Sequence, residues 1–155
     1  MALQSTTALA TVTLQQPAST VTFSGIPATY RDLIVVISGK LTSDAFWGLR
    51  FNNDSTSSYS FVRMYGTGTT TVSDNNTQTE VIVESGLSSD QSHWITQIMD
   101  YSATDKHKTV LVRNSQNLVH AVANRWAKTE AINEIRTAGG TWAIGSTFSL
   151  YGRIA

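Results

Sequence analysis

The chain of 155 residues carries 11 basic and 11 acidic side chains, which gives a formal net charge of zero, and it contains no cysteine. This length suits one domain that buries enough apolar surface to fold without a metal or a disulfide. The absence of cysteine excludes disulfides and thiolate metal sites. The lack of a basic excess argues against a nucleic-acid partner, because neutralising phosphates supplies most of the affinity of such proteins.

Uncharged polar residues take the place of charges, since only 14% of the chain is charged, against about 25% in ordinary globular domains. Near-zero net charge favours association between molecules over mutual repulsion. No segment approaches the roughly 20 apolar residues that cross a bilayer. The N-terminal segment lacks the charged and apolar regions of a secretory signal, so we expect synthesis in the cytoplasm and no membrane contact.

Short apolar segments that alternate with polar residues predict β-strands along the chain. The first is Val21–Phe23. The next, Leu33–Ile37, is apolar throughout, which predicts a central strand that is covered on both faces. Trp47–Phe51 alternates again. The further predicted strands are Ser60–Tyr65, Val81–Val83, His93–Met99, Thr109–Arg113, Val119–Arg125 and Thr147–Ile154.

Two segments are harder to assign. Gly66–Thr79 is rich in turn-forming residues and predicts a long loop at a hairpin tip, uncharged until Asp74 and long enough to reach a neighbouring subunit. Ala123–Arg136 has helical propensity and is followed closely by two glycines, but it also fits two strands joined by a turn, and both alternatives stay open. Roughly eight to ten short strands predict a single all-β domain over residues 1–155, an antiparallel sandwich or barrel with at most one short helix.

No arrangement of residues predicts catalysis. The three histidines, His93, His107 and His120, lack the spacing of a metal site. A serine nucleophile in a G-x-S-x-G turn is absent from the sequence. Glu80 and Glu84 lie about 13 Å apart if they flank a strand, which exceeds the carboxylate separation of either class of glycosidase. We therefore expect no enzymatic activity, no cofactor and no bound metal.

The four tryptophans are the best candidates for binding a partner, because exposed indole rings often dominate interfaces. Trp47 alternates with Leu49 and Phe51 and is predicted to lie in the core. Trp142 lies in a glycine-flanked turn and is predicted to be the most exposed. Trp142 and Trp126 are therefore the candidate interface residues, with core packing as the alternative for both.

Three segments resemble a known group of proteins. They are TVTFSGIPATYRDL from Thr20 to Leu33, LRFNND from Leu49 followed by SYSFVRMYG from Ser58, and GSTFSLYG from Gly145. Together they span most of the chain and resemble jelly-roll virion proteins of tailed bacteriophages. Such domains serve as capsid cement or decoration proteins and as modules of tail fibres.

The resemblance implies a jelly roll without catalytic residues, located in the virion, with the major capsid protein and two further copies of itself as partners. A homotrimer that clamps neighbouring capsid subunits would stabilise the shell. Fibre proteins of this kind carry an attachment region before the jelly roll, whereas here the first strand is expected close to Met1, which favours the cement function. The alternative is a tail appendage that recognises a host glycan.

Overall fold

The computed structural model describes residues 6–66, 68–84, 90–115 and 119–154, and this part of the chain forms twelve strands and no helix. The strands are β1 (Thr6–Thr13), β2 (Thr22–Ser24), β3 (Asp32–Gly39), β4 (Trp47–Phe51), β5 (Tyr59–Gly66), β6 (Thr71–Gln78), β7 (Val81–Glu84), β8 (Ser92–Met99), β9 (Lys108–Ser115), β10 (Val119–Trp126), β11 (Glu134–Ala138) and β12 (Thr147–Arg153). None of the described residues belongs to a helix that could span a membrane. The prediction of an all-β chain is confirmed.

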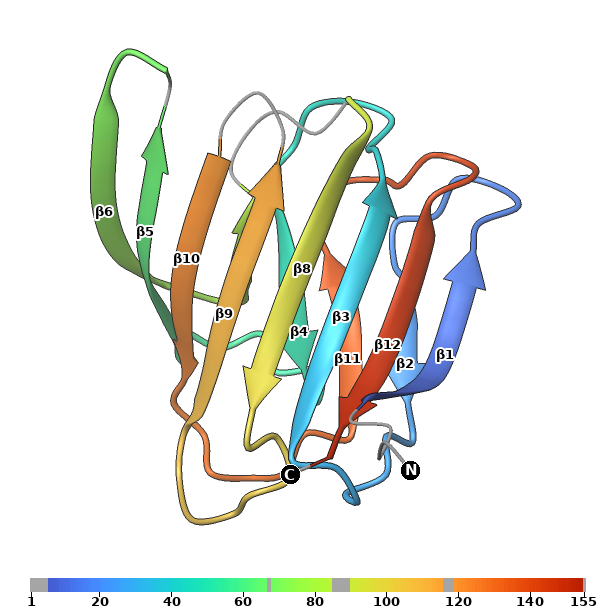
Figure 1. The fold of residues 1–155 in the computed structure, drawn as a ribbon, viewed down its shortest axis with the longest axis vertical. Coiled ribbons are helices and arrows are strands. Elements are labelled where there is room, and N and C mark those ends of the chain that lie inside the picture. Colours follow the sequence, from blue (N-terminus) through green and yellow to red (C-terminus); the bar gives the residue numbers. More distant parts are fainter. Residues whose placement is uncertain (1–5, 67, 85–89, 116–118, 155) are drawn as a thin grey trace, which may run out of the picture.

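The strands form two antiparallel sheets that pack face to face (Figure 1). The larger sheet has eight strands in the order β1-β12-β3-β8-β9-β10-β5-β6, and the smaller has four in the order β2-β11-β4-β7. Every pair of neighbouring strands runs antiparallel. The architecture is therefore a jelly-roll-like β-sandwich, as the sequence predicts.

The core lies between the sheets and contains a cluster of three tryptophans. Trp47 comes from β4, Trp94 from β8 and Trp142 from the loop before β12. Their ring centroids lie 4.7, 5.1 and 5.7 Å apart, with the rings close to perpendicular. Edge-to-face pairs of this kind contribute about 0.5–1.5 kcal/mol each beyond the burial of their area.

The predicted central strand has two unequal faces. β3 lies inside the larger sheet between β12 and β8, as expected for a central strand. Leu33, Val35 and Ile37 are buried against the smaller sheet. Ile34 and Val36 point the other way and are only half-buried, so the prediction that both faces are covered is wrong for this chain on its own.

The two ambiguous segments both form strands. Ala123–Arg136 is a strand, a turn and a second strand, since β10 ends at Trp126 and β11 starts at Glu134. Gly66–Thr79 is not a long loop, because most of it forms β6, which pairs with β5 over eight residues. Its side chains are mostly exposed on both sides, so no apolar alternation marks it as a strand.

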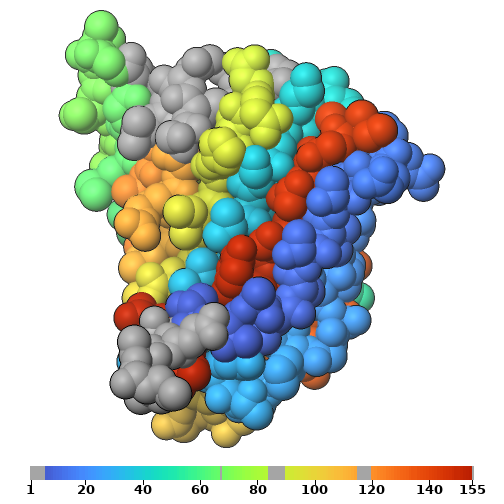
Figure 2. Space-filling view, turned by 45° about the vertical axis from the view of Figure 1, so that its right-hand side comes forward, coloured from blue at the N-terminus to red at the C-terminus, as the bar shows by residue number. Residues whose placement is uncertain are grey.

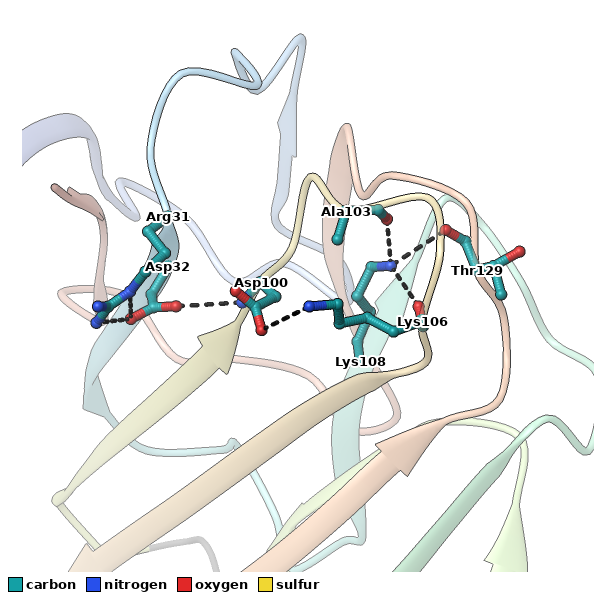
Figure 3. Close-up of polar contacts among 7 residues, drawn as sticks. All are labelled: Arg31, Asp32, Asp100, Ala103, Lys106, Lys108 and Thr129. Atoms are coloured by element: carbon teal, nitrogen blue, oxygen red, sulfur yellow. Dashed lines mark hydrogen bonds and ion pairs between the residues drawn. The ribbon is translucent and has the colours of Figure 1, made fainter. Parts of the chain in front are cut away.

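Polar groups close the end of the sandwich where β9 begins and β10 ends (Figure 3). The Lys108 side chain is fully buried, and its Nζ donates hydrogen bonds to the carbonyl oxygens of Ala103, Lys106 and Thr129 at 2.5, 3.0 and 3.2 Å. Burial lowers the pKa of this ammonium group, and the charge of Asp105 opposes the change. Lys108 thus ties two loops to the end of the core.

A second set of contacts holds the same end together. The buried Asp32 carboxylate accepts hydrogen bonds from the Arg31 guanidinium at 2.8 Å and from the backbone N–H of Asp100 at 3.1 Å. The Asp100 side chain lies 3.7 Å from Lys106 Nζ. These contacts join the start of β3 to the loop after β8 (Figure 3).

Candidate docking face on the larger sheet

The two tryptophans that the sequence analysis selects for an interface do not reach the surface. Trp142 and Trp126 are both 0% exposed, so the prediction that Trp142 is exposed is wrong. Gly139 and Gly140 explain the burial of Trp142. Their positive φ angles of 80° and 67° turn the chain back across Leu41, and Trp142 then bridges to Ala18 and Leu41 with its ring in the core.

Trp126 is held by the turn after β4. Its indole Nε1 donates to Asp54 Oδ2 at 2.8 Å, and its ring stacks on Tyr59 at 6.2 Å. Burial alone raises the pKa of Asp54, but hydrogen bonds donated by Ser58, Thr56 and Trp126 outweigh it and hold that pKa well below its usual range. Phe51–Asp54 and Ser58–Tyr59 belong to the segments that resemble phage proteins. In this structure they form the turn after β4 and hold Trp126 in place.

The titratable side chains do not assemble a metal site in the described part of the chain. No group of three or more His, Asp or Glu side chains converges there. Glu80 forms an ion pair with Arg50 at 2.9 Å, and His93 is exposed. His120 is buried beside Tyr65, with ring centroids 5.3 Å apart. These contacts are accounted for by folding.

The most unusual surface is the outer face of the larger sheet, which we define as the side turned away from the smaller sheet. Four of its large apolar side chains are exposed: Met64 by 61%, Val62 by 55%, Ile95 by 42% and Leu111 by 37%. They come from three strands, β5, β8 and β9. A group of exposed apolar side chains on one face often marks an interaction site.

Strand register brings these residues into two neighbouring rows across the sheet. One row runs through Met64, Ala121, Arg113, Ile95 and Val36, each opposite the next. The other row runs through Val62, Ala123, Leu111, Gln97 and Ile34. We call the apolar members of these rows the outer patch: Ile34, Val36, Val62, Met64, Ile95, Leu111, Ala121 and Ala123.

The outer patch is hollowed at its centre. A depression of about 480 Å³ lies over β5, β9 and β10, with Val62, Met64, Leu111, Ala121 and Ala123 in its lining. The two alanines are the reason, because their short side chains leave a dip between the longer ones on β5 and β9. Such a dip fits an apolar side chain of a partner.

The charges around the outer patch have one sign. The exposed charged residues on the outward-pointing strand positions are Arg113, Arg125 and Arg153. The one carboxylate on those positions, Asp32, is buried and bonded to Arg31. The outward strand positions of this face are therefore locally basic.

The sequence contains a signal for this face that does not involve tryptophan. In β8 the buried Trp94 is followed by Ile95, and in β9 the buried Val110 and Val112 flank Leu111. Apolar residues at outward positions of otherwise alternating strands indicate a second apolar face. Recognising it as one patch requires the order of the strands, which sequence alone does not give.

Comparisons with known proteins identify no family. No protein-family model matches the chain, and no curated protein matches it. Among solved structures, the Caenorhabditis elegans galectin LEC-6 is 9% identical, with 96% of this chain and 98% of that chain covered and a TM-score of 0.39. The exo-inulinase from Aspergillus awamori is 16% identical over 97% of this chain and 29% of that chain, with a TM-score of 0.41. Lactose- and MES-liganded congerin II is 16% identical over 82% and 97%, with a TM-score of 0.40.

Proposed function

We propose that this protein is a structural component of a tailed-phage virion, a cement or decoration protein that docks on the capsid through the outer face. The observation that carries the proposal is the outer patch, eight apolar residues on the open side of the larger sheet. The phage-like segments of the sequence supply the virion context. The three-fold assembly that the resemblance implies belongs to the same proposal.

The chemistry of the outer face indicates the kind of partner surface that would suit it. Its centre is apolar and hollowed, and Arg113 and Arg125 lie in or beside it. The complementary surface is therefore a protein surface with apolar side chains at its centre and carboxylates around them. A second copy docked by the same face would bring arginines toward arginines, so a different protein, the capsid subunit, suits the face better.

The tail-appendage alternative has less support. An exposed tryptophan would suit a host glycan, but Trp142 and Trp126, the candidate interface residues, are both buried. The location of the protein in the particle separates the two functions. Many copies, in proportion to the major capsid protein, would support cement, whereas a handful would place the protein on the tail.

The experiment has two steps. Quantitative mass spectrometry of purified virions first measures the copy number against the major capsid protein. Particles that lack the protein are then incubated with purified wild type, Leu111→Asp or the control Ile144→Asp, which changes an equally apolar residue, 65% exposed, in the loop before β12.

We expect Leu111→Asp to bind roughly tenfold more weakly or worse, because it buries an unpaired carboxylate in the interface. Ile144→Asp should bind like the wild type. Absence of the protein from virions would reject the virion proposal. Presence with equal binding of all three proteins would reject the outer face as the docking surface.

A further inference from the structure

The two sheets have four terminal strands, and each presents backbone groups that another strand could pair with. They are β1 and β6 in the larger sheet and β2 and β7 in the smaller. Natural proteins protect such edges with short strands, bulges, lysines, prolines or covering side chains, because an open edge recruits other chains. The four edges of this protein differ in how they are protected.

Three of the edges carry a protective feature. β1 has a break in its register with β12 between Ala8 and Ala10. β2 is only three residues long. β7 has four residues, and the side chain of Asn124 covers its edge by accepting from the N–H of Ile82 at 2.9 Å and donating to its carbonyl at 3.2 Å. None of these strands offers a long regular edge.

Within the described residues β6 is the least protected edge: Asn76 Oδ1 accepts a hydrogen bond from the N–H of Thr77 at 2.8 Å, but the strand is long and has no break in its register. Its eight residues, TVSDNNTQ, pair with β5 in unbroken register and include neither proline nor lysine. The only charge, Asp74, is held by Arg63 of β5 through its guanidinium. The β5–β6 hairpin also stands out from the body of the sandwich, so the far edge of β6 faces solvent (Figures 1 and 2).

We propose that β6 pairs in antiparallel orientation with β6 of a second copy, around a two-fold axis that passes beside Asn75. The pairing would join two eight-stranded sheets into one continuous sheet. The added backbone hydrogen bonds satisfy the open edges of both copies at once. A two-fold contact also uses the same strand on both sides, as an isologous interface requires.

Charge selects the register. A two-fold axis normal to the sheet puts the outer faces of both copies on the same side. Each residue then pairs with the residue of the second copy that lies equally far from the axis in the opposite direction. An axis beside Asp74 would place two carboxylates opposite each other, which is unfavourable. An axis beside Asn75 places Asp74 opposite Asn76 of the second copy, whose amide donates hydrogen bonds, and Ser73 opposite Thr77. With this register, seven residues of each strand overlap.

A second copy also fits the rest of the molecule. The net charge of zero leaves no long-range repulsion between copies. Because the axis is normal to the sheet, the outer faces of the two copies point the same way and both stay open. A pair of copies therefore presents a doubled docking face, which would strengthen attachment to any shared surface through multivalency. The pairing itself does not depend on the proposed virion function.

The absence of cysteine from the chain permits a direct test by single-cysteine variants. In the proposed register Asn75 lies opposite itself, with Cα atoms about 4.5–5.5 Å apart, within the range that a disulfide spans. Under mild oxidation, Asn75→Cys should form covalent dimers on the order of tenfold faster than Thr77→Cys. Thr77 is an exposed residue on the same face of β6, but in this register it lies about 14 Å from its own counterpart.

Mixing two cysteine variants tests whether the two β6 strands run antiparallel. Ser73→Cys and Thr77→Cys should each form few disulfides alone but should form heterodimers when mixed, since Ser73 faces Thr77 of the second copy. Sedimentation of the wild type should show association that Asn75→Lys weakens, with circular dichroism confirming that the variant stays folded.

Equal cross-linking of Asn75→Cys and Thr77→Cys would overturn the proposal, because it indicates random collision. A wild type that stays monomeric, or whose assembly is unchanged by Asn75→Lys, would overturn it too. All these measurements use purified protein without particles. Their failure would therefore leave capsid docking through the outer face untouched, although a monomeric wild type would also reject the three-fold assembly; failure of particle binding would leave the β6 pairing untouched.

Discussion

The two faces of the eight-stranded sheet are made by the same strands yet serve different purposes. Trp94 and Ile95 are neighbours in β8, but Trp94 is completely buried and Ile95 is 42% exposed. On the inner face the smaller sheet covers the apolar side chains. On the outer face nothing within the described chain covers them. The inner face thus determines whether the chain folds, and the outer face is available to a partner.

The polar residues follow the same division. Lys108 lies at the start of β9 and Asp54 in the turn after β4, and each is held by several hydrogen bonds within the chain. On the outer face, Arg113 and Arg125 are exposed. Substitutions on the inner side should therefore change the free energy of unfolding, and those on the outer side should change binding.

The largest expected effect is on the tryptophan cluster. Trp94→Ala should lower the free energy of unfolding by about 3–5 kcal/mol, because it leaves a cavity between Trp47 and Trp142. Ile95→Ala, at the adjacent position, should cost less than about 1 kcal/mol. Urea denaturation followed by tryptophan fluorescence measures both. Similar losses for the two variants would show that the outer face is as important for folding as the inner face.

Removing the buried ammonium group should have the next largest effect. Lys108→Met keeps the length of the side chain but leaves three carbonyl oxygens without their donor. We expect a loss of about 2–3 kcal/mol in the free energy of unfolding. The control is Lys106→Met. Lys106 is exposed and forms one long ion pair, 3.7 Å from Asp100, so this variant should lose less than about 0.5 kcal/mol in the free energy of unfolding. Equal losses in the two variants would contradict a structural role for Lys108.

Asp54 should make stability depend on acid. Its pKa in the folded protein is held well below the unfolded value of about 3.9, so the unfolded chain binds more protons as the pH falls below neutral. Its contribution is complete above about pH 5 and is lost as the pH falls through 4 toward the folded pKa. Asp54→Asn should cost about 1–2 kcal/mol at pH 7. Its denaturation midpoint should fall less between pH 5 and pH 2.5 than that of the wild type, and parallel curves would reject this role for Asp54.

Much of the fold could be predicted from the sequence because burial on one face leaves a period of two. The strands containing Phe23 and Leu49 follow that pattern. β6 could not be predicted in this way, since it is exposed on both sides and its polar residues also suit a loop. For Ala123–Arg136 the sequence left a helix and two strands open, because helical propensity is weak evidence; tertiary pairing selects the two strands.

The candidate site was harder to predict than the fold. An indole in a glycine-rich turn suggested exposure, but the positive φ angles at Gly139 and Gly140 direct the next residues into the core. The outer patch depends on register across β5, β10, β9, β8 and β3, which are distant in sequence. Local sequence patterns carry no information about which strands become neighbours.

The smallest expected effect concerns the arginines at the outer patch. Arg113→Gln and Arg125→Gln should leave the free energy of unfolding within about 0.5 kcal/mol of the wild type, because both side chains are exposed. If the partner carries carboxylates around an apolar centre, each variant should weaken binding to particles only modestly and should reduce its dependence on salt. Leu111→Ser should instead weaken binding equally at low and high salt. Binding isotherms at several salt concentrations separate the two contributions, and an unchanged salt dependence in both arginine variants would mean that the partner recognises only the apolar centre of the outer face.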